Sequence, residues 1–266
     1  MNLFQKRVPI LYNLQVGPVY FKMGLAFPEL AEKARPGQFV MVKPNERLLP
    51  LLRRPFSVHC PILEDGQVQG FELLYKVVGQ GTGAMSEMEP DDELDVLGPL
   101  GNGFSFPQEV RHAYLVAGGV GVAGLYYLGL YLQKMGRSRS TVFLGGCSAA
   151  DILCREEFES MGAKIWVTTE DCSLGEKGLV TSMVENVLKD NGKPDVIYAC
   201  GPQAMLKAVR DLGVAHDVRC QISLESVMAC GFGACLGCAV ERAGNPGAYL
   251  HVCTDGPVFD SRAVAM

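Results

Sequence analysis

Four cysteines near the end of the chain have the spacing that points most directly to chemistry. They are Cys230, Cys235, Cys238 and Cys253. The first three form the pattern C-x4-C-x2-C, the plant-type spacing of thiolates that bind a 2Fe-2S cluster, although the gap to the last cysteine is shorter than usual. Gly231, Gly233 and Gly237 lie between them, where a loop around a cluster needs positive φ angles and backbone N–H groups close to the sulfurs. We therefore predict a 2Fe-2S cluster, which passes electrons one at a time.

Structural zinc, disulfides and inert cysteines are the alternatives for this segment. Zinc sites usually contain two C-x2-C pairs, or cysteine with histidine, whereas this segment has one such pair. Disulfides fit poorly because residues 1–6 lack the layout of an export signal. Ten cysteines in such a chain favour a reducing compartment, and we expect a cytoplasmic protein.

Length and composition predict a globular protein with two domains and a small appendage. The chain has 266 residues, of which 48% are hydrophobic and 20% charged. The net charge is −5 and the basic residues form no stripe along the sequence, so nucleic acid is not an expected partner. Residues 113–133 carry no charge and are long enough to span a bilayer. Glycines interrupt this run, and a buried strand, a glycine turn and a helix explain it better, so we predict no membrane span.

The first part of the chain has the pattern of short strands separated by Pro and Gly, which is typical of a small antiparallel β-barrel. The predicted strands are 19–23, 38–42, 56–60, 71–78 and 93–97. Beyond about residue 107, apolar strands alternate with amphipathic helices, which predicts a parallel α/β sheet. Its predicted strands are 114–117, 141–144, 164–168, 195–199 and 219–223, and its predicted helices are 121–134, 149–160, 179–189 and 203–212. The expected domains are therefore a β-barrel over 1–107, an α/β domain over 108–223 and a cluster domain over 224–266.

One stretch of the predicted barrel could bind a diphosphate. The run RRPFS (53–57) places an arginine and a hydroxyl on one strand, and a guanidinium pairs well with phosphate oxygens. Residues 79–83 (GQGTG) precede a predicted short helix over 84–88, whose free amides could complete an anion site. The alternative is an exposed arginine and a flexible turn without a ligand.

Glycines after the first strand of the second domain indicate a nucleotide site. Gly119, Gly121 and Gly124 form G-x-G-x-x-G between a strand and a helix. The acidic residue that usually binds the ribose about twenty positions later is missing, because residues 145–148 read GGCS and Asp151 comes only afterwards. We therefore predict nucleotide binding without the standard dinucleotide-binding geometry.

A cysteine also follows the fourth predicted strand of this domain. The run Cys200-Gly201-Pro202 lies at the carboxyl edge of the predicted sheet, where open α/β folds bind their ligands. The alternative is a small buried cysteine with a packing role only. The predicted nucleotide residues are Gly118, Gly119, Gly121, Cys200, Gly201 and Pro202.

The order of these motifs resembles that of the ferredoxin reductase family of flavoproteins over nearly the whole chain. Within that family, three runs are similar to the electron transfer subunits of class B, NAD-linked dihydroorotate dehydrogenases. These runs are LGPLGNGF (97–104), SLESVMACGFGACLGCAV (223–240) and HVCTDGPVFD (251–260). The resemblance implies that the barrel binds FAD, that the four cysteines bind the 2Fe-2S cluster and that NAD is the substrate.

The resemblance also implies which barrel residues bind FAD. They are Arg54, Pro55, Phe56, Ser57, Leu74, Tyr75, Lys76, Gly81 and Thr82. The sequence departs from the family at two places: proline is usual where Gly124 stands, and tyrosine is common where Phe56 stands. The first departure bears on the approach of the nicotinamide, whereas the second removes only a hydroxyl.

The implied activity is that of an oxidoreductase subunit in pyrimidine biosynthesis. A separate FMN-containing subunit would oxidise dihydroorotate to orotate, and electrons would cross the cluster and FAD to NAD+. Flavin suits the middle position because it exchanges two electrons with nicotinamide and single electrons with the cluster. The expected assembly is a heterotetramer with two copies of each subunit. The alternatives are a subunit that passes electrons between NADPH and ferredoxin, and a zinc-stabilised, non-catalytic interaction module.

Overall fold

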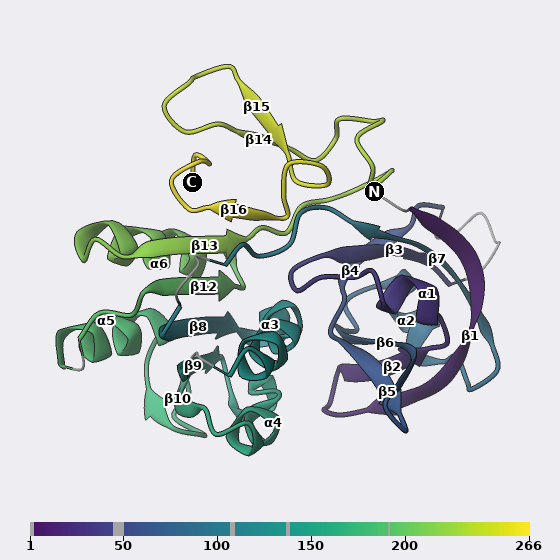
Figure 1. Cartoon of the computed structure of the whole chain (residues 1–266), viewed down its shortest axis with the longest axis horizontal. Coiled ribbons are helices and arrows are strands. Elements are labelled where there is room, and N and C mark those ends of the chain that lie inside the picture. The colour runs from purple at the N-terminus through teal and green to yellow at the C-terminus, as the bar shows by residue number, and fades with distance from the viewer. Residues whose placement is uncertain (1–2, 45–50, 107–109, 137–138, 191) are drawn as a thin grey trace.

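The computed structural model describes residues 3–44, 51–106, 110–136, 139–190 and 192–266. Figure 1 shows two lobes side by side, an antiparallel barrel and a parallel sheet with helices, and the C-terminal segment lies along one edge of the second lobe and reaches toward the first. The predicted fold class, which combines a β-barrel, a parallel α/β sheet and a small C-terminal segment with the cysteines, is confirmed.

The first lobe is a seven-stranded antiparallel sheet that curls into a barrel, with the strand order β4-β3-β7-β1-β2-β6-β5. Its elements are β1 (Phe4–Gln15), β2 (Tyr20–Leu25), α1 (Pro28–Ala31), β3 (Phe39–Lys43), β4 (Arg54–Ser57), β5 (Cys60–Glu64), β6 (Gln67–Lys76), α2 (Gln80–Ser86) and β7 (Glu93–Leu100). Alternate residues along each strand face inward, so Met23, Leu25, Leu73 and Tyr75 lie in one buried core.

Two details of the predicted barrel are wrong. Sequence periodicity missed β1 altogether, and it joined residues 56–60 into one strand, whereas β4 ends at Ser57 and β5 begins at Cys60. Between them the chain changes its hydrogen-bonding partner: the amide of Val58 donates to Gln38 (3.0 Å), and the amide of His59 donates to Glu72 (2.8 Å). The residues that connect the two strands therefore cross from one half of the barrel to the other.

The short helix after β6 begins earlier than predicted, at Gln80 rather than at residue 84. The hydroxyl of Thr82 accepts hydrogen bonds from the amides of Val78 (2.9 Å) and Gly79 (3.2 Å) and so caps the helix. Gly81 and Gly83 of GQGTG thus belong to α2, and Gly79 immediately precedes it as the N-cap residue.

The second lobe is a seven-stranded sheet with the order β11-β10-β9-β8-β12-β13-β16, parallel except for β16. Its elements are β8 (His112–Gly118), η1 (Gly119–Gly121), α3 (Val122–Lys134), β9 (Arg139–Gly146), η2 (Ala149–Asp151), α4 (Arg155–Ser160), β10 (Lys164–Thr169), β11 (Glu176–Lys177), α5 (Val180–Asp190), β12 (Val196–Cys200), α6 (Gln203–Ala215), β13 (Arg219–Ser223) and β16 (Val258–Asp260). The connections reverse direction between β8 and β12, which is the topological switch point at which such sheets bind ligands.

Helices cover both faces of this sheet. Tyr114 and Val116 of β8 pack with α5 and α6, whereas Leu115 and Ala117 pack with α3 and α4 on the opposite face. Within the described residues, no helix has the length and apolar character needed to cross a bilayer. The charge-free run 113–133 is therefore the strand, glycine turn and helix that the sequence predicted.

The predicted helix 149–160 is broken into η2 and α4. Cys154, immediately before α4, has a positive φ of 59°, which an α-helix does not accommodate. Asp151 at the end of η2 accepts a hydrogen bond of 2.5 Å from the hydroxyl of Tyr20 in the barrel. This segment thus follows the surface of the other lobe rather than continuing as a helix.

The C-terminal segment contacts both lobes. It forms a two-stranded hairpin of β14 (Ala239–Glu241) and β15 (Tyr249–His251), after which β16 pairs antiparallel with β13. On the barrel side, the side-chain amide of Asn102 donates to the carbonyl of Thr254 (2.8 Å), and Gly231 lies against Met41 of β3.

Candidate functional site

The β14–β15 hairpin brings two of the four cysteines together. Its register pairs Ala239 with His251, which places Cys238, just before β14, beside Cys253, just after β15. Their sulfurs are 3.2 Å apart, and the amide of Cys253 points at the sulfur of Cys238 (3.4 Å). Both side chains are buried. A hairpin of ordinary geometry is therefore enough to create a pair of enclosed thiols.

The loop before the hairpin forms a second pair. The amide of Cys235 donates to the sulfur of Cys230 (3.4 Å). Burial raises the pKa of Cys230, but hydrogen bonds from the amides of Phe232 and Cys235 outweigh this effect and lower the pKa to about 7. Gly231 has a φ of 83°, and a Cβ there would lie 2.4 Å from Met41, so only glycine fits. The loop thus stabilises a thiolate next to the barrel.

The two pairs adjoin one another, as a two-iron site requires. Gly233 of the loop lies against Thr254, the residue after Cys253, because a Cβ on Gly233 would lie 2.8 Å from the Thr254 methyl group. Burial and the neighbouring Cys238 raise the pKa of Cys253 to about 12. Four thiols arranged two and two, with amides directed at the sulfurs, are a suitable donor set for a 2Fe-2S cluster. Among the residues that the structure describes, no three His, Cys, Asp or Glu side chains surround one point as the ligands of a single metal ion would.

Arg54 and the start of α2 form a polar corner of the barrel. The guanidinium of Arg54 packs over Gly81, where an added Cβ would lie 2.5 Å from Arg54 Nε. Arg54 also donates a hydrogen bond to the carbonyl of Leu52. The hydroxyl of Thr82 is used by the helix cap, so only its backbone is free for a ligand. The structure therefore places a guanidinium and the first turn of α2 side by side, an arrangement that fits a diphosphate.

Because side chains alternate along a strand, some of the other predicted flavin residues face the barrel interior and some face the second lobe. Tyr75 is 1% exposed and its hydroxyl bonds inside the barrel, so its side chain is closed to a ligand. Phe56 packs edge-on against Tyr75, with ring centroids 5.9 Å apart. Leu74 faces the second lobe, and the ammonium of Lys76 lies 5.2 Å from the centroid of the Tyr20 ring. Leu74 and Lys76 thus line the space between the lobes.

Two turns meet at the switch point of the second sheet. A Cβ on Gly118 would lie 2.7 Å from Pro202, and a Cβ on Gly121 would lie 2.3 Å from the carbonyl oxygen of Cys200. Gly119 has a φ of 52° with no atom within 4 Å of its Cβ position, so its backbone faces open space. The glycine turn and the run Cys200-Gly201-Pro202, far apart in sequence, therefore form one surface.

The barrel and this surface face each other across Gly124. A Cβ on Gly124 would lie 3.3 Å from the hydroxyl of Ser57 and 3.5 Å from the sulfur of Cys200. Burial, and secondarily the carboxylate of Glu225, raises the pKa of Cys200 to about 12, so this thiol is neutral. Gly124 thus lies in close contact with both the barrel hydroxyl and this thiol.

The end of β9 differs from a standard ribose site. Asp151 bonds to the amide of Ser148 (3.1 Å) and to Tyr20, and it lies 3.7 Å from the ammonium of Lys76. Lys76 of the barrel therefore brings a cation to this strand end. Arg139 begins β9 at its opposite end.

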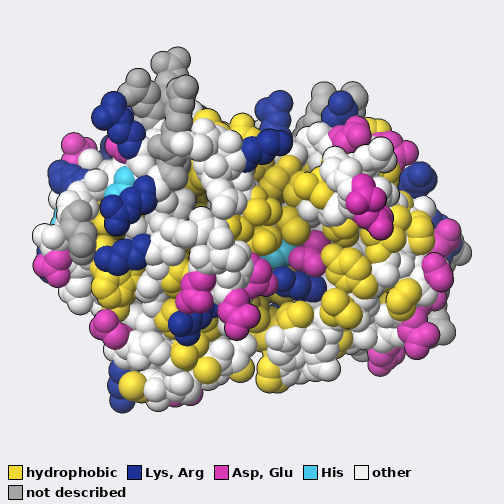
Figure 2. Space-filling view, turned by 60° about the horizontal axis from the view of Figure 1, so that its bottom comes forward, with side chains coloured by type: hydrophobic (Ala, Val, Ile, Leu, Met, Phe, Trp, Pro, Cys, Tyr) yellow, Lys and Arg dark blue, Asp and Glu magenta, His cyan; other side chains and the backbone are white. Residues whose placement is uncertain are grey.

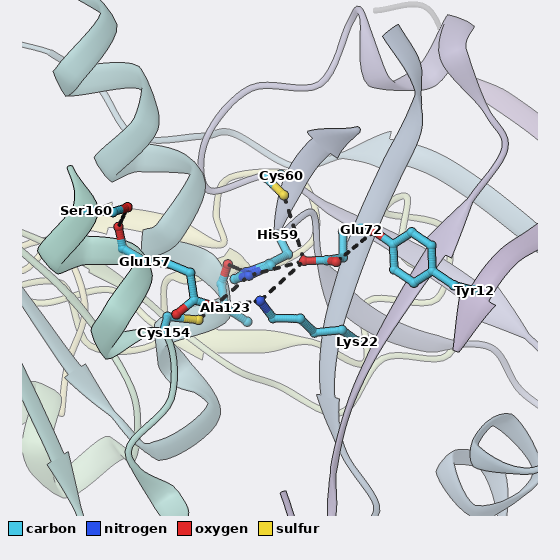
Figure 3. Close-up of polar contacts among 9 residues, drawn as sticks. All are labelled: Tyr12, Lys22, His59, Cys60, Glu72, Ala123, Cys154, Glu157 and Ser160. Carbon is cyan, nitrogen blue, oxygen red and sulfur yellow. Dashed lines mark hydrogen bonds and ion pairs between the residues drawn. The ribbon is translucent and has the colours of Figure 1, made fainter. Parts of the chain in front are cut away.

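Sequence reasoning missed a polar cluster at the junction of the two lobes (Figure 3). It consists of Lys22, His59, Cys60 and Glu72 from the barrel and Cys154 and Glu157 from the second lobe. The ammonium of Lys22 lies 2.8 Å from Glu157 and 3.9 Å from Glu72. Burial opposes the charge of Lys22, but the hydrogen bond to Glu157 keeps its pKa above the usual value. The only sequence signal was a lysine within the apolar run YFKMGL.

A cavity of about 340 Å³ opens beside this cluster. It is lined by Val16, Lys22, Leu74, Ile152, Leu153, Cys154, Arg155, Glu156, Glu157 and Leu174. Figure 2 shows a hollow between the two lobes with hydrophobic walls and charged side chains at its floor and rim. The junction is thus partly open to solvent on this side.

Two family models match the chain. Residues 225–265 match the iron-sulfur cluster binding domain of dihydroorotate dehydrogenase B, and residues 115–211 match the oxidoreductase NAD-binding domain. Among solved structures, a chain of NADH-dependent reduced ferredoxin-NADP oxidoreductase superposes with a TM-score of 0.84 at 31% identity, covering 97% of this chain and 89% of that one.

Curated relatives match over nearly the full length. The dihydroorotate dehydrogenase B (NAD(+)) electron transfer subunit of Caldanaerobacter subterraneus subsp. tengcongensis is 40% identical over 257 residues, 96% of both chains. The subunit of the same name from Listeria welshimeri is 37% identical over 267 residues, 99% of this chain and 100% of the relative. The chain therefore belongs to the family of dihydroorotate dehydrogenase B electron transfer subunits.

Proposed function

We propose that this chain is the electron transfer subunit of an NAD-linked dihydroorotate dehydrogenase. It accepts electrons from an FMN-containing catalytic subunit that oxidises dihydroorotate, and it delivers them to NAD+. The observation that carries this proposal is the position of the paired cysteines. Gly231 of their loop touches Met41, and Met41 pairs in the sheet with Pro55 of the strand that bears Arg54 and Ser57. A short path therefore leads from the thiols to the proposed flavin strand.

The proposed cofactor residues follow from this geometry and from the family. Cys230, Cys235, Cys238 and Cys253 would bind the cluster; Arg54, Pro55, Phe56, Ser57, Leu74, Tyr75, Lys76, Gly81 and Thr82 would bind FAD, with Tyr75 contributing backbone only. Gly118, Gly119, Gly121, Cys200, Gly201 and Pro202 would bind NAD. Bound flavin supplies the exchange between two-electron and one-electron chemistry. The chain supplies position: Ser57 of the proposed flavin strand and Cys200 of the proposed NAD site lie together against Gly124, so the two sites adjoin one another.

The exposed side of the cysteine loop is the proposed contact with the catalytic subunit. Cys235 is exposed, and Val227 (88%), Phe232 (50%) and Leu236 (58%) beside it leave large apolar side chains in solvent. Apolar residues at such a site suit a protein interface. We propose an assembly with two copies of each subunit. All ten cysteines are free, which agrees with the reducing cytoplasm as the proposed location.

We further propose three functional regions with limits at residues 1–107, 108–223 and 224–266. The third region is not independent of the second, because β16 extends the second sheet beside β13. The limits therefore divide ligand sites rather than separately folding bodies.

Reconstitution tests the proposal. The purified chain should carry flavin and iron, oxidise NADH with artificial acceptors and leave dihydroorotate unchanged. Addition of a catalytic FMN subunit should create dihydroorotate-dependent NAD+ reduction. Oxidation of dihydroorotate by the isolated chain would contradict the division of labour. A colourless protein that contains zinc would support the interaction-module alternative instead.

A second candidate is a subunit that passes electrons between NADPH and ferredoxin. The TM-score of 0.84 with the ferredoxin-NADP oxidoreductase chain favours it. The same reconstitution separates the two functions, because this candidate requires reduction of ferredoxin and no coupling to dihydroorotate.

A further inference from the structure

We propose that the polar junction of Lys22, His59 and Glu157 positions the nucleotide sheet against the barrel and thereby sets the distance between flavin and nicotinamide. These are positioning residues for the proposed electron transfer, on which the inference rests. No side chain of this junction belongs to the cofactor residues proposed above, and each makes its contact across the boundary between the lobes.

Lys22 provides the ionic part of the junction. It lies on β2 of the barrel with a side chain only 18% exposed, and its ammonium is 2.8 Å from Glu157 on α4 of the second lobe. The same ammonium is 3.9 Å from Glu72 on β6 of its own lobe. An apolar contact tolerates sliding, whereas a partly buried ion pair is satisfied in one relative position of the two lobes.

His59 provides the second contact, close to the proposed cofactor site. Its ring is fully buried and stacks on Tyr126 of α3 at 4.6 Å, and its Nδ1 lies 3.1 Å from the carbonyl oxygen of Ala123. A carbonyl only accepts, so Nδ1 carries the proton and donates it. Ala123 precedes Gly124, the residue that faces Ser57 and Cys200. A contact from the barrel therefore fixes the first turn of α3 one residue away from Gly124, where the two proposed cofactor sites adjoin.

One short stretch of the barrel contains both a proposed flavin-binding residue and a junction residue. Ser57 and His59 lie two residues apart at the end of β4, and they meet the adjacent residues Gly124 and Ala123 of α3. A shift of α3 against the barrel must therefore change how closely Ser57 of the proposed flavin strand approaches Gly124 and Cys200 of the proposed NAD site. Because reacting atoms must approach within about 3–3.5 Å, a shift of about 1 Å costs on the order of 100-fold in rate.

The test compares Glu157→Gln with Lys189→Met. Glu157→Gln removes the charge across the junction while leaving Lys22 and Glu72 together in the barrel, so folding is preserved. Lys189→Met removes a surface ion pair of similar length, 2.7 Å to Glu185 on α5, far from the junction. Lys22→Met is a second, stronger variant of the same contact.

Two measurements are made on the holoprotein. The first is the rate at which iodoacetamide labels Cys154, a thiol buried at the junction with 7% exposure, followed by peptide mass spectrometry. The second is NADH oxidation with an artificial acceptor. For Glu157→Gln and Lys22→Met we expect faster labelling and a kcat lowered about 10- to 100-fold, with unchanged FAD content and little change in KM. For Lys189→Met we expect the labelling rate of Cys154 and the kcat to equal those of the parent.

Parental labelling and kcat in both junction variants would overturn the inference. So would a lower kcat without faster labelling, because the effect would then not pass through the junction. A parent protein that binds no flavin would refute the proposed function, but the labelling rates would still decide whether Lys22 and Glu157 fix the two lobes.

Discussion

The cysteine loop and the junction of the two lobes are built in opposite ways. All four cysteines lie between residues 230 and 253, and one hairpin register together with one tight loop brings them together. The contact at Gly124 instead requires Ser57 of β4, the first turn of α3 and Cys200 of β12, three elements distant in sequence. The first site depends on local backbone geometry, and the second depends on the placement of two lobes.

This difference determines how each site should fail. Loss of a ligand in the loop removes the local donor set and leaves the lobes in place. A change at the junction or at the switch point leaves every proposed ligand present but alters the distances between them. Substitutions at the two regions should therefore separate loss of a cofactor from loss of rate.

The largest effect is expected for Cys235→Ser in the loop. The exposed thiol is a proposed cluster ligand, and its loss should abolish the cluster absorption and coupled dihydroorotate-dependent NAD+ reduction. FAD should remain, because its proposed residues lie in the barrel, and some direct NADH oxidation should persist. Iron analysis and a visible spectrum check this outcome, with Cys172→Ser, another exposed cysteine, as the control. Unchanged iron in Cys235→Ser would show that this thiol is no ligand.

At the switch point, Gly121→Ala should act on nucleotide binding. The added Cβ would lie 2.3 Å from the carbonyl oxygen of Cys200, so the two turns must separate. We expect the KM for NADH to rise at least about 10-fold with iron and FAD retained, since overpacking of this kind costs about 1–3 kcal/mol. Gly162→Ala is the control, because it strains a surface turn with a φ of 77° away from the site. An unchanged KM for NADH in Gly121→Ala would show that the glycine turn does not contribute to the NAD site.

These contrasts also show what could be predicted from the sequence. The grouped cysteines, the glycine turn and the order of barrel and sheet were visible because each is encoded by local spacing or periodicity. The break at Cys154 and the change of partner at Val58 were not, because the first depends on packing against the other lobe and the second on barrel residues distant in sequence, Gln38 and Glu72. Lys22 and His59 were missed because a lone polar residue in an apolar run carries no information about a partner that is 135 residues away for Lys22 and 64 residues away for His59.

The junction should also make stability depend on pH. Burial lowers the pKa of His59 to about 4, against an ordinary value of about 6.5, so the unfolded chain binds a proton between these values that the native protein does not. Stability should therefore fall as the pH drops from about 6.5 toward 4, by up to about 3 kcal/mol from this group. Burial raises the pKa of Glu72, which opposes part of this loss.

The measurement is the urea midpoint between pH 7 and pH 5. His59→Gln, which keeps an amide donor for Ala123 but does not titrate, should flatten the dependence on pH. An equally steep dependence in this variant would assign the effect to other groups.

A smaller effect is expected for Arg54→Ala in the barrel. Loss of a charge-assisted contact to diphosphate should weaken FAD binding by about 2 kcal/mol, measured by flavin release during dialysis. Ser57→Ala should weaken it less. Arg53→Ala is the matched control, because Arg53 is already paired with Asp95 at 2.7 Å and should affect stability rather than flavin affinity. Equal flavin retention in Arg54→Ala and the parent would show that the FAD diphosphate does not bind at Arg54.

The smallest expected effect is a preference for NADH over NADPH of roughly 10-fold in kcat/KM, because a 2′-phosphate needs a free cation at the end of β9. Lys76 reaches this end but lies 3.7 Å from Asp151, whose carboxylate would repel a phosphate. Arg139 is the first residue of β9 (Arg139–Gly146). At about 3.3 Å per residue, it lies roughly 20 Å from the end of the strand where the 2′-phosphate would bind. Asp151→Asn should free Lys76 from its ion pair and reduce the preference for NADH over NADPH. Asp171→Asn, on an exposed turn, should leave this preference unchanged. Equal turnover of the two nucleotides by the parent would mean that Lys76 already serves the phosphate, and that the barrel contributes to the nucleotide site as directly as it does to the junction.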